Sequence, residues 1–145
     1  MTDLQAMLMQ QEGTGPYHDG RFFPYVDSVG KTTIGYGHNL DAKGMSDAEV
    51  MMLLSSDIAD ALDDVRHCFS CYDQLSRARQ LVLVSMAFNL GRERLNKFVR
   101  FIGAVHRGDW QEAAEEILDS TAAKQAPDRY KALAKMMREN TSQWV

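Results

Sequence analysis

TGPYHDGRFFPYVDSVGKTTIGYGHNL, residues 14–40, is the stretch that decides the fold of this 145-residue chain. Glycine and aromatic residues are frequent in it, and β-branched residues gather at 26–29 and 32–34. The pairs Asp19-Gly20 and Val29-Gly30 are typical of turns between short strands. We therefore expect a small antiparallel sheet of two or three strands in this part of the chain.

Helices are expected on both sides of this stretch. Residues 1–12 have the apolar spacing of a short amphipathic helix, which Gly13 ends. Ser46 and Glu49 form a capping box that opens a long helix over about 46–67. Later helices are expected from Ser76 to about residue 90, over about 93–106, from Asp109 to about Asp119, and from Pro127 to about Arg138.

These elements predict an α+β fold that is mainly helical. A small antiparallel sheet lobe at about 13–44 and a helical lobe at about 72–145, which also takes the N-terminal helix 1–12, are joined by the long helix. Two lobes on one connecting helix imply a cleft between them. One domain is expected, because the sequence shows no internal repeat, low-complexity run or linker.

The composition, with 45% hydrophobic and 25% charged residues, is that of a globular protein. Residues 1–12 carry no basic cluster and no long apolar run, so we expect no signal peptide, no transmembrane helix and no stable membrane association. The net charge of −4 argues against a nucleic-acid-binding domain with a broad basic face.

The charges are unevenly distributed along the chain. Residues 47–64 contain six acidic residues and no Lys or Arg, whereas residues 92–107 contain five Lys or Arg and one Glu. Solvated helix faces explain both runs. The alternative is a local basic surface within 92–107 that meets a polyanion.

Cys68 and Cys71 form a Cys-x-x-Cys run next to His67. A redox pair would follow a strand and open a helix, whereas this run follows an expected helix. A zinc site needs about four ligands, and the sequence has no second Cys/His pair at a suitable spacing. Two ordinary reduced cysteines and no metal are therefore expected.

The N-terminal third of the chain contains several carboxyl groups that could take part in acid–base chemistry. Cleavage of a glycosidic bond generally uses one protonated and one ionised carboxyl group on opposite sides of the bond. Glu12 ends the first expected helix, where the negative end of the helix dipole favours the protonated form that a general acid needs. The alternative for Glu12 is a solvent-facing side chain at a frayed helix end. The other candidates are Asp19, Asp27 and Asp41.

Asp27 and Thr33 lie on either side of the predicted turn, so the Thr33 hydroxyl is placed to face Asp27. The alternative for Asp27 is a residue that initiates this turn. A strand that continues past Thr33 would put Gly35 and Gly37 on the same face, which leaves room for a ligand. A dinucleotide-binding loop is excluded, because this Gly-x-Gly lacks the third glycine and the helix that follows it.

Three segments together resemble the active-site region of the phage-type lysozymes, glycoside hydrolase family 24. They are Glu12-Gly13, Pro24-Tyr25-Val26-Asp27 and Thr33-Ile34-Gly35-Tyr36-Gly37-His38. The family pattern is a Glu, then a Tyr two residues before an Asp, then Thr-Ile-Gly-x-Gly-His. Residues 88–91 are also similar to the cleft-facing segment of the family, and residues 110–114 and 125–129 resemble its last helices. The resemblance covers almost the whole chain and implies a lysozyme-like fold.

The resemblance implies that Glu12 is the general acid. Asp27 and Thr33 would hold and activate the attacking water, with inversion at the anomeric carbon. The other implied site residues are Phe88, Asn89 and Asn39, which would bind sugar, and His38, Asp57 and Arg129, which would support the site.

The implied supporting contacts are specific. His38 would pair with Asp57 on the long helix. Arg129 would lie near Glu12, where its positive charge favours the ionised carboxylate and opposes the effect of the helix end.

The sequence departs from the family pattern in several respects, of which two concern the site and the core. The gap between Glu12 and Asp27 is longer than in the best-known members, which we interpret as an inserted turn or small strand extension at 14–22 at the mouth of the cleft. This insertion leaves Asp19 as an alternative second carboxylate. Ala122 and Ala123 stand where aromatic residues are usual, so core packing there must differ.

The resemblance implies an endolysin that hydrolyses the β-1,4 bond between N-acetylmuramic acid and N-acetylglucosamine in bacterial peptidoglycan and lyses the host cell. No cofactor is implied, and a monomer is expected. Such a protein would stay in the host cytoplasm until a separate membrane protein, a holin, opens the membrane. The alternatives are a lytic transglycosylase on the same fold, which needs no water-activating Asp, and a non-catalytic wall-binding module.

Overall fold

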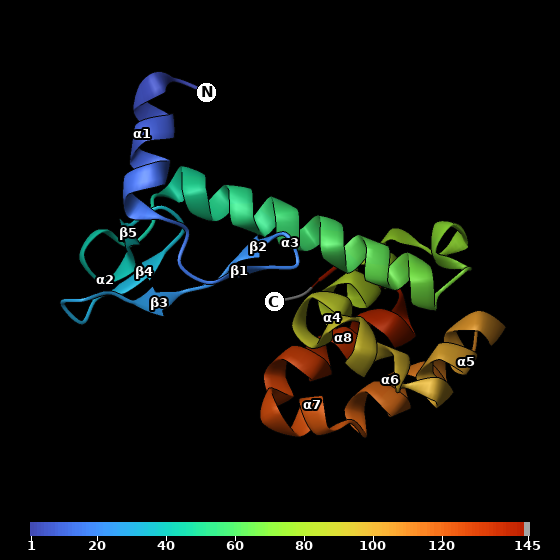
Figure 1. Ribbon diagram of the computed structural model, residues 1–145. Coiled ribbons are helices and arrows are strands. Elements are labelled where there is room, and N and C mark those ends of the chain that lie inside the picture. Colours follow the sequence, from blue (N-terminus) through green and yellow to red (C-terminus); the bar gives the residue numbers. More distant parts are fainter. Residues whose placement is uncertain (144–145) are drawn as a thin grey trace. The chain divides into compact units, whose positions relative to one another are not determined.

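The computed structural model describes residues 1–143. Contacts within the chain divide it into two compact units, residues 1–52 and the residues from 53 onward, and each unit is described by itself. Most described residues are helical and a small antiparallel sheet lies in the first unit, so the predicted α+β fold is confirmed (Figure 1). The cleft between two lobes stays a prediction.

The first unit begins with α1 (Asp3–Glu12), which a capping box opens. The Gln5 amide donates to Thr2 Oγ1 at 3.1 Å, and the Thr2 amide donates to Gln5 Oε1 at 2.8 Å. The contacts group α1 with the sheet residues, whereas the sequence analysis assigned residues 1–12 to the helical lobe. One reason is that the side chain at the end of α1, Glu12, packs against Gly37 in the sheet region.

Five short strands follow α1, where the sequence predicted two or three. β1 (Tyr17–His18) and β2 (Arg21–Phe22) form a hairpin, while β3 (Tyr25–Val26), β4 (Thr32–Ile34) and β5 (His38–Asn39) form a separate antiparallel sheet. In the first hairpin both turn residues have positive φ, 53° at Asp19 and 72° at Gly20, the combination that a two-residue hairpin turn requires. The segment predicted as an inserted turn or small strand extension is therefore a separate two-stranded hairpin, and its place at the mouth of a cleft stays a prediction.

Two helices complete the first unit and lead out of it. α2 (Leu40–Lys43) follows β5 directly, and α3 (Asp47–Cys68) begins in the first unit and continues into the second. The predicted capping box of α3 is confirmed. The Ser46 amide donates to Glu49 Oε2 at 2.7 Å, and the Glu49 amide donates to Ser46 Oγ at 3.3 Å.

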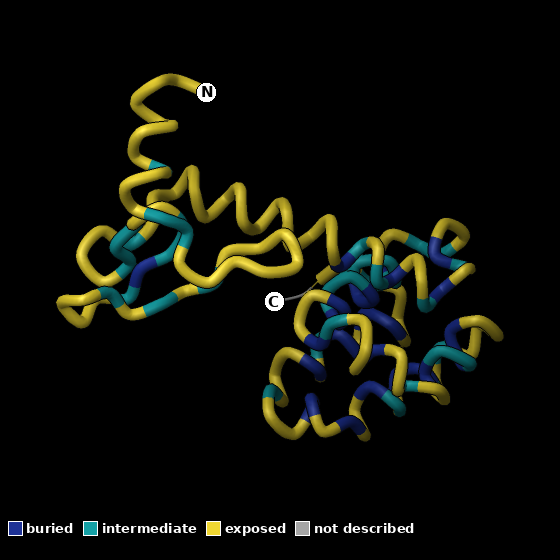
Figure 2. Tube along the Cα trace, viewed as in Figure 1, coloured by how far each residue is buried: buried dark blue, intermediate teal, exposed yellow. Residues whose placement is uncertain are grey.

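The second unit is helical. Its elements after α3 are η1 (Tyr72–Gln74), α4 (Arg77–Asn96), α5 (Val99–Arg107), α6 (Trp110–Leu118), α7 (Thr121–Gln125) and α8 (Pro127–Glu139). Buried segments gather in α4 to α8 (Figure 2). The largest fully buried side chains include Tyr130, Phe101, Leu83 and Met86, so this unit has a hydrophobic core of its own.

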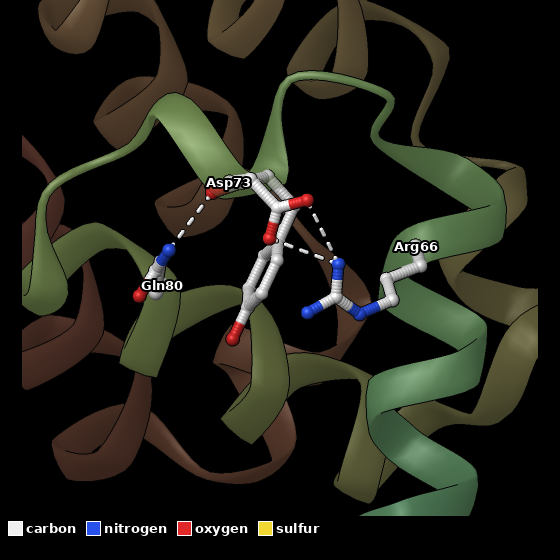
Figure 3. A network of polar contacts seen from close by, with 4 residues as sticks. Arg66, Asp73 and Gln80 are labelled. Carbon is white, nitrogen blue, oxygen red and sulfur yellow. Dashed lines mark hydrogen bonds and ion pairs between the residues drawn. The ribbon is translucent and has the colours of Figure 1, made fainter.

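A polar network closes the connection between α3 and α4 (Figure 3). Arg66 Nη1 donates to both carboxylate oxygens of Asp73, at 2.9 and 3.0 Å, and its guanidinium lies 4.9 Å from the centre of the Tyr72 ring. Gln80 Nε2 donates to the Tyr72 carbonyl at 3.0 Å. These contacts fix the turn that carries the two cysteines.

Cys68 and Cys71 are free in this turn, in keeping with two ordinary cysteines. Burial raises the pKa of both thiols, so less reactive thiolate forms at neutral pH than in an exposed cysteine.

The helix predicted over 93–106 is wrong as a single element. α4 bends at Gly91, which has φ 75° and ψ 169°, and then continues to Asn96, while α5 starts at Val99. The sequence has no Gly or Pro at 97–98 to mark this break. Leu95 before the break and Phe101 after it are both fully buried, so the chain packs into the core on both sides of it.

The helices predicted from Asp109 and Pro127 are confirmed, and Asp109 Oδ1 accepts the Glu112 amide at 3.1 Å. The Glu112 carboxylate binds Arg107 instead of returning to the cap, so only half of a capping box forms. None of the helices in the described part of the chain is long and apolar enough to cross a membrane.

Candidate active site

Glu12 is the last residue of α1, and Gly13 allows the chain to turn directly after it, with φ 70°. The Glu12 carboxylate reaches the main chain of Gly37. A methyl group in place of the Gly37 hydrogen would lie 3.2 Å from Glu12 Oε2. Gly37 is therefore needed for its positive φ of 84° and for the close approach of this carboxylate.

The predicted strand face that would unite Thr33, Gly35 and Gly37 is wrong. β4 ends at Ile34, and residues 35–37 form a turn that leads into β5. Gly35 and Gly37 both have positive φ, 64° and 84°, which a continuing strand does not allow. The turn brings the main chain towards Glu12 instead of opening a flat face to a ligand.

Asp27 initiates the turn between β3 and β4, as the alternative interpretation of its position predicted. Its Oδ1 accepts the Val29 amide at 3.0 Å and the Lys31 amide at 2.8 Å. Two N–H groups that donate to one carboxylate oxygen hold the side chain in place. The turn contacts thus fix the orientation of the Asp27 side chain, and its catalytic role stays a prediction.

Thr33 is only 3% exposed, and its hydroxyl donates to the Lys31 carbonyl at 3.0 Å. The same carbonyl accepts the Asp27 amide at 2.9 Å. Asp27 therefore lies opposite Lys31, and strand alternation places the Asp27 and Thr33 side chains on one face of the hairpin. The main chain of Lys31 joins the two residues that the sequence predicted to act together.

The segment after β4 is fixed by side-chain bonds to main-chain groups. Asn39 Oδ1 accepts the Ala42 amide at 2.9 Å and so caps α2, and Asp41 Oδ2 accepts the Thr32 amide at 2.7 Å. Asn39, predicted to bind sugar, keeps its amide NH₂ for that purpose. Asp41, one of the candidate carboxylates, has a structural task at β4.

His38 Nε2 donates a hydrogen bond to the Gly44 carbonyl at 2.7 Å. The ring is thereby tied to the residue that follows α2. Its pairing with Asp57 would join the two units and stays a prediction.

Asp19 sits at the tip of the β1–β2 hairpin, where its side chain is 95% exposed and 3.5 Å from His18. Its positive φ of 53° explains an aspartate at this place, because Asp tolerates this conformation better than most residues. The turn therefore accounts for Asp19 without a catalytic role.

In the second unit, Phe88 and Asn89 lie on α4 before its bend. Asn89 Oδ1 accepts the hydroxyl of the fully buried Tyr130 at 2.6 Å, which leaves the Asn89 NH₂ group as a donor. Phe88 is 44% exposed and lines a hollow of about 340 Å³. The other residues of this hollow are Asp57, Asp60, Ala61, Asp64, Ala87 and Gly91.

This hollow brings together two residues that the sequence treated separately, since Asp57 from α3 and Phe88 from α4 both line it. Arg129 is attached to α4, because its Nη2 donates to the carbonyl and to the hydroxyl of Ser85, both at 3.1 Å. The position of Arg129 near Glu12 would again join the two units and stays a prediction.

Three features of the candidate site could not be predicted from the sequence. Lys31 acts through its main chain, so its residue type carries no sign of its role. Tyr130, which orients Asn89, looks like an ordinary aromatic residue of the core when only the sequence is considered. The contact of Gly37 with Glu12 depends on a turn, whereas the alternation of residues 33–38 suggested a strand.

The comparisons with known proteins support a lysozyme-like, glycosidase-type enzyme that cleaves peptidoglycan. The model of the family described as phage lysozyme matches residues 17–139, and the chain belongs to this family. A curated relative, probable T4-type lysozyme 2 of Dictyostelium discoideum, is 25% identical over 158 aligned positions, which cover 89% of each chain. Asp27 and Thr33 lie inside the family match, while Glu12 precedes it.

Proposed function

We propose that the protein is an endolysin that hydrolyses the β-1,4 bond between N-acetylmuramic acid and N-acetylglucosamine. Glu12 donates a proton to the leaving oxygen, and Asp27 with Thr33 activates water on the other side of the sugar, so that the anomeric carbon inverts. The observation that carries this proposal is the Lys31 peptide, which holds Asp27 and Thr33 on one face of a hairpin.

The hydrogen bonds leave the required atoms available. Asp27 uses Oδ1 for the turn, and its Oδ2 has no partner among the described residues, so it can take a proton from water. The Thr33 hydroxyl donates to Lys31 and its oxygen still accepts a hydrogen bond from the same water. A water that donates to both Asp27 Oδ2 and the Thr33 oxygen points its lone pair away from them. This is the orientation in which the water can attack the anomeric carbon.

Sugar recognition follows a similar arrangement. Asn39 and Asn89 both use their side-chain oxygen within the protein, which leaves two NH₂ groups to donate to hydroxyl or acetamido oxygens of a sugar. Phe88 offers an exposed ring for the apolar face of a sugar. We further propose that the enzyme acts as a monomer and reaches the wall from the host cytoplasm when a holin opens the membrane.

The proposal is tested with purified peptidoglycan. The wild type should clear it in a zymogram, and Glu12→Gln should lower the rate by about 10²- to 10⁴-fold, the usual contribution of a general acid. Analysis of the released ends then identifies the reaction. Reducing ends show hydrolysis, while anhydro ends would show a lytic transglycosylase and overturn the role of Asp27. Binding to the wall without any clearing would identify a non-catalytic wall-binding module.

A matched pair of variants tests the second carboxylate. Asp27→Asn keeps an oxygen that accepts the Val29 and Lys31 amides, so the turn persists while the charge is lost. We expect a loss of activity from Asp27→Asn and full activity from Asp19→Asn, which makes the same change at the exposed hairpin tip. The reverse result would make Asp19 the second carboxylate.

A further inference from the structure

Three aromatic side chains form an exposed cluster in the first unit, which we call the aromatic strip: Tyr17, Phe22 and Tyr36. Tyr17 and Phe22 are directly opposite each other on β1 and β2, with ring centres 4.8 Å apart. Phe22 also contacts Tyr36 edge to face, with ring centres 5.4 Å apart. The three residues are 53%, 38% and 39% exposed. A contiguous group of exposed aromatic residues is a candidate binding surface.

The strip adjoins the candidate acid. Tyr36 directly precedes Gly37, the residue against which the Glu12 carboxylate packs. Tyr36 also lines a hollow of about 530 Å³ together with residues of α1, the helix that ends at Glu12. These α1 residues are Met1, Gln5, Leu8 and Met9. Tyr36 thus belongs both to the strip and to a hollow lined by α1, the helix that ends at Glu12.

We propose that the aromatic strip binds sugar rings of the glycan strand and extends the substrate site beyond the bond that is cleaved. This inference rests on the proposed function and names a sugar-binding surface for it. The negative face of an aromatic ring attracts the C–H groups on the apolar face of a sugar, and the tyrosine hydroxyls can bond its polar rim. No charged side chain belongs to the strip, which suits the neutral N-acetylglucosamine units of the glycan.

The geometry of the strip suits a chain of sugars better than one flat ligand. The rings are inclined by 60° between Tyr17 and Phe22 and by 66° between Phe22 and Tyr36, so they form a stepped surface. Successive sugars of a β-1,4-linked glycan are rotated relative to one another and likewise present a stepped edge. Each centre-to-centre spacing is close to the length of one sugar residue.

The hairpin that carries the strip is well defined although it is short. Asp19 and Gly20 set its turn, and the Phe23 amide donates to the Pro16 carbonyl at 2.9 Å, which closes its base. A cross-strand aromatic pair also stabilises a hairpin, so the rings would be expected here even without a ligand. The test must therefore separate binding from hairpin stability.

Leucine substitutions keep apolar bulk and remove the aromatic face. We expect Tyr17→Leu, Phe22→Leu and Tyr36→Leu each to weaken binding of N-acetylglucosamine oligomers by about two- to tenfold, measured by titration calorimetry. The loss should grow with oligomer length for Tyr17 and Phe22. With glycan strands as substrate, KM should rise while kcat stays within about twofold. Val50→Ala, which trims an exposed apolar residue of the same unit outside the strip, should change neither value.

A second measurement does not depend on any variant. Addition of oligomer to the wild type should shift the NMR signals of the Tyr17 and Tyr36 ring protons, and unchanged signals at saturating oligomer would overturn the inference. Wild-type binding by folded leucine variants would overturn it as well. The two proposals fail separately, because a wild type that shifts these signals without cleaving the glycan contradicts the proposed function and leaves the strip intact.

Discussion

The two units of this protein are held together in different ways. Among the described residues, Thr33 is the single buried residue of the first unit, whereas the buried apolar side chains all lie between Ala61 and Met137 in the second. The first unit instead relies on side chains that bond main-chain groups, such as Asp27 at its turn and Asn39 at α2. In the first unit, the bonds that position the candidate catalytic residues are therefore the same bonds that hold the unit together.

The largest effect on stability is expected from the core of the second unit. Phe101 is fully buried beside Phe69 and Phe98, so Phe101→Ala should lower the free energy of unfolding by about 3–5 kcal/mol. Val99→Ala on the same helix, at a residue that is 73% exposed, should change it by less than about 0.5 kcal/mol. Urea denaturation measures both, and equal effects would contradict a core-dependent second unit.

The two glycines of the turn before β5 offer a sharper contrast. Gly37→Ala and Gly35→Ala should each lower stability by about 1–2 kcal/mol, because both residues have positive φ. Only the methyl group at Gly37 meets the Glu12 carboxylate, since nothing lies within 4 Å of one placed at Gly35. Activity per folded molecule should therefore fall strongly for Gly37→Ala and little for Gly35→Ala. A similar loss for both would show that strain, not the contact with Glu12, limits activity.

Much of the fold could be predicted from the sequence because its helix ends are encoded locally. The capping box at Ser46, the cap at Ser76 and the proline at 127 all begin helices where the sequence placed them. The break between α4 and α5 could not be predicted, because no glycine or proline marks residues 97–98. α7 also escaped, since its five residues are too few to show a helical period.

The sequence suggested which residues form the candidate site, but it could not suggest their contacts. Both interpretations of Asp27 refer to the same carboxylate, and the structure confirms its turn-initiating role through Val29 and Lys31. The link from Asp27 to Thr33 runs through a main-chain carbonyl, which no side-chain pattern reveals. The contacts of His38 and Arg129 with the other unit remain predictions.

Loss of the hydrogen bond between the Thr33 hydroxyl and the Lys31 carbonyl should have an effect of intermediate size on stability and activity. Thr33→Val removes the hydroxyl that binds the Lys31 carbonyl, so stability should fall by about 1 kcal/mol. Activity should fall by about ten- to a hundredfold, because the water loses one of its two positioning groups. Thr33→Ser keeps the hydroxyl and should retain most of the activity. If valine performs as well as serine, the hydroxyl takes no part in catalysis.

The smallest effect concerns pH, and it should separate the two units. The Ser46 amide and hydroxyl, which bind the Glu49 carboxylate, lower the pKa of Glu49 from its ordinary value of 4.5, with a further contribution from His38. A lowered pKa means that the folded protein favours the ionised form. The stabilisation is therefore complete above the ordinary value and is lost as pH falls through the lowered one. Hydrogen exchange at the Ser46 amide should accelerate in that acidic range.

Two controls make this prediction specific to the polar first unit. Glu49→Gln retains an oxygen for the Ser46 amide but cannot titrate, so exchange at Ser46 should lose its acid-dependent acceleration. Amides of the buried α4 residues Val82 and Leu83 should keep their protection over the same range, because no carboxylate caps that helix and Ser76 does so instead. If acid removes the protection of the Ser46 amide and of the α4 amides together, the two units open as one. The two units would then differ in the residues that hold them together, but they would not differ in stability.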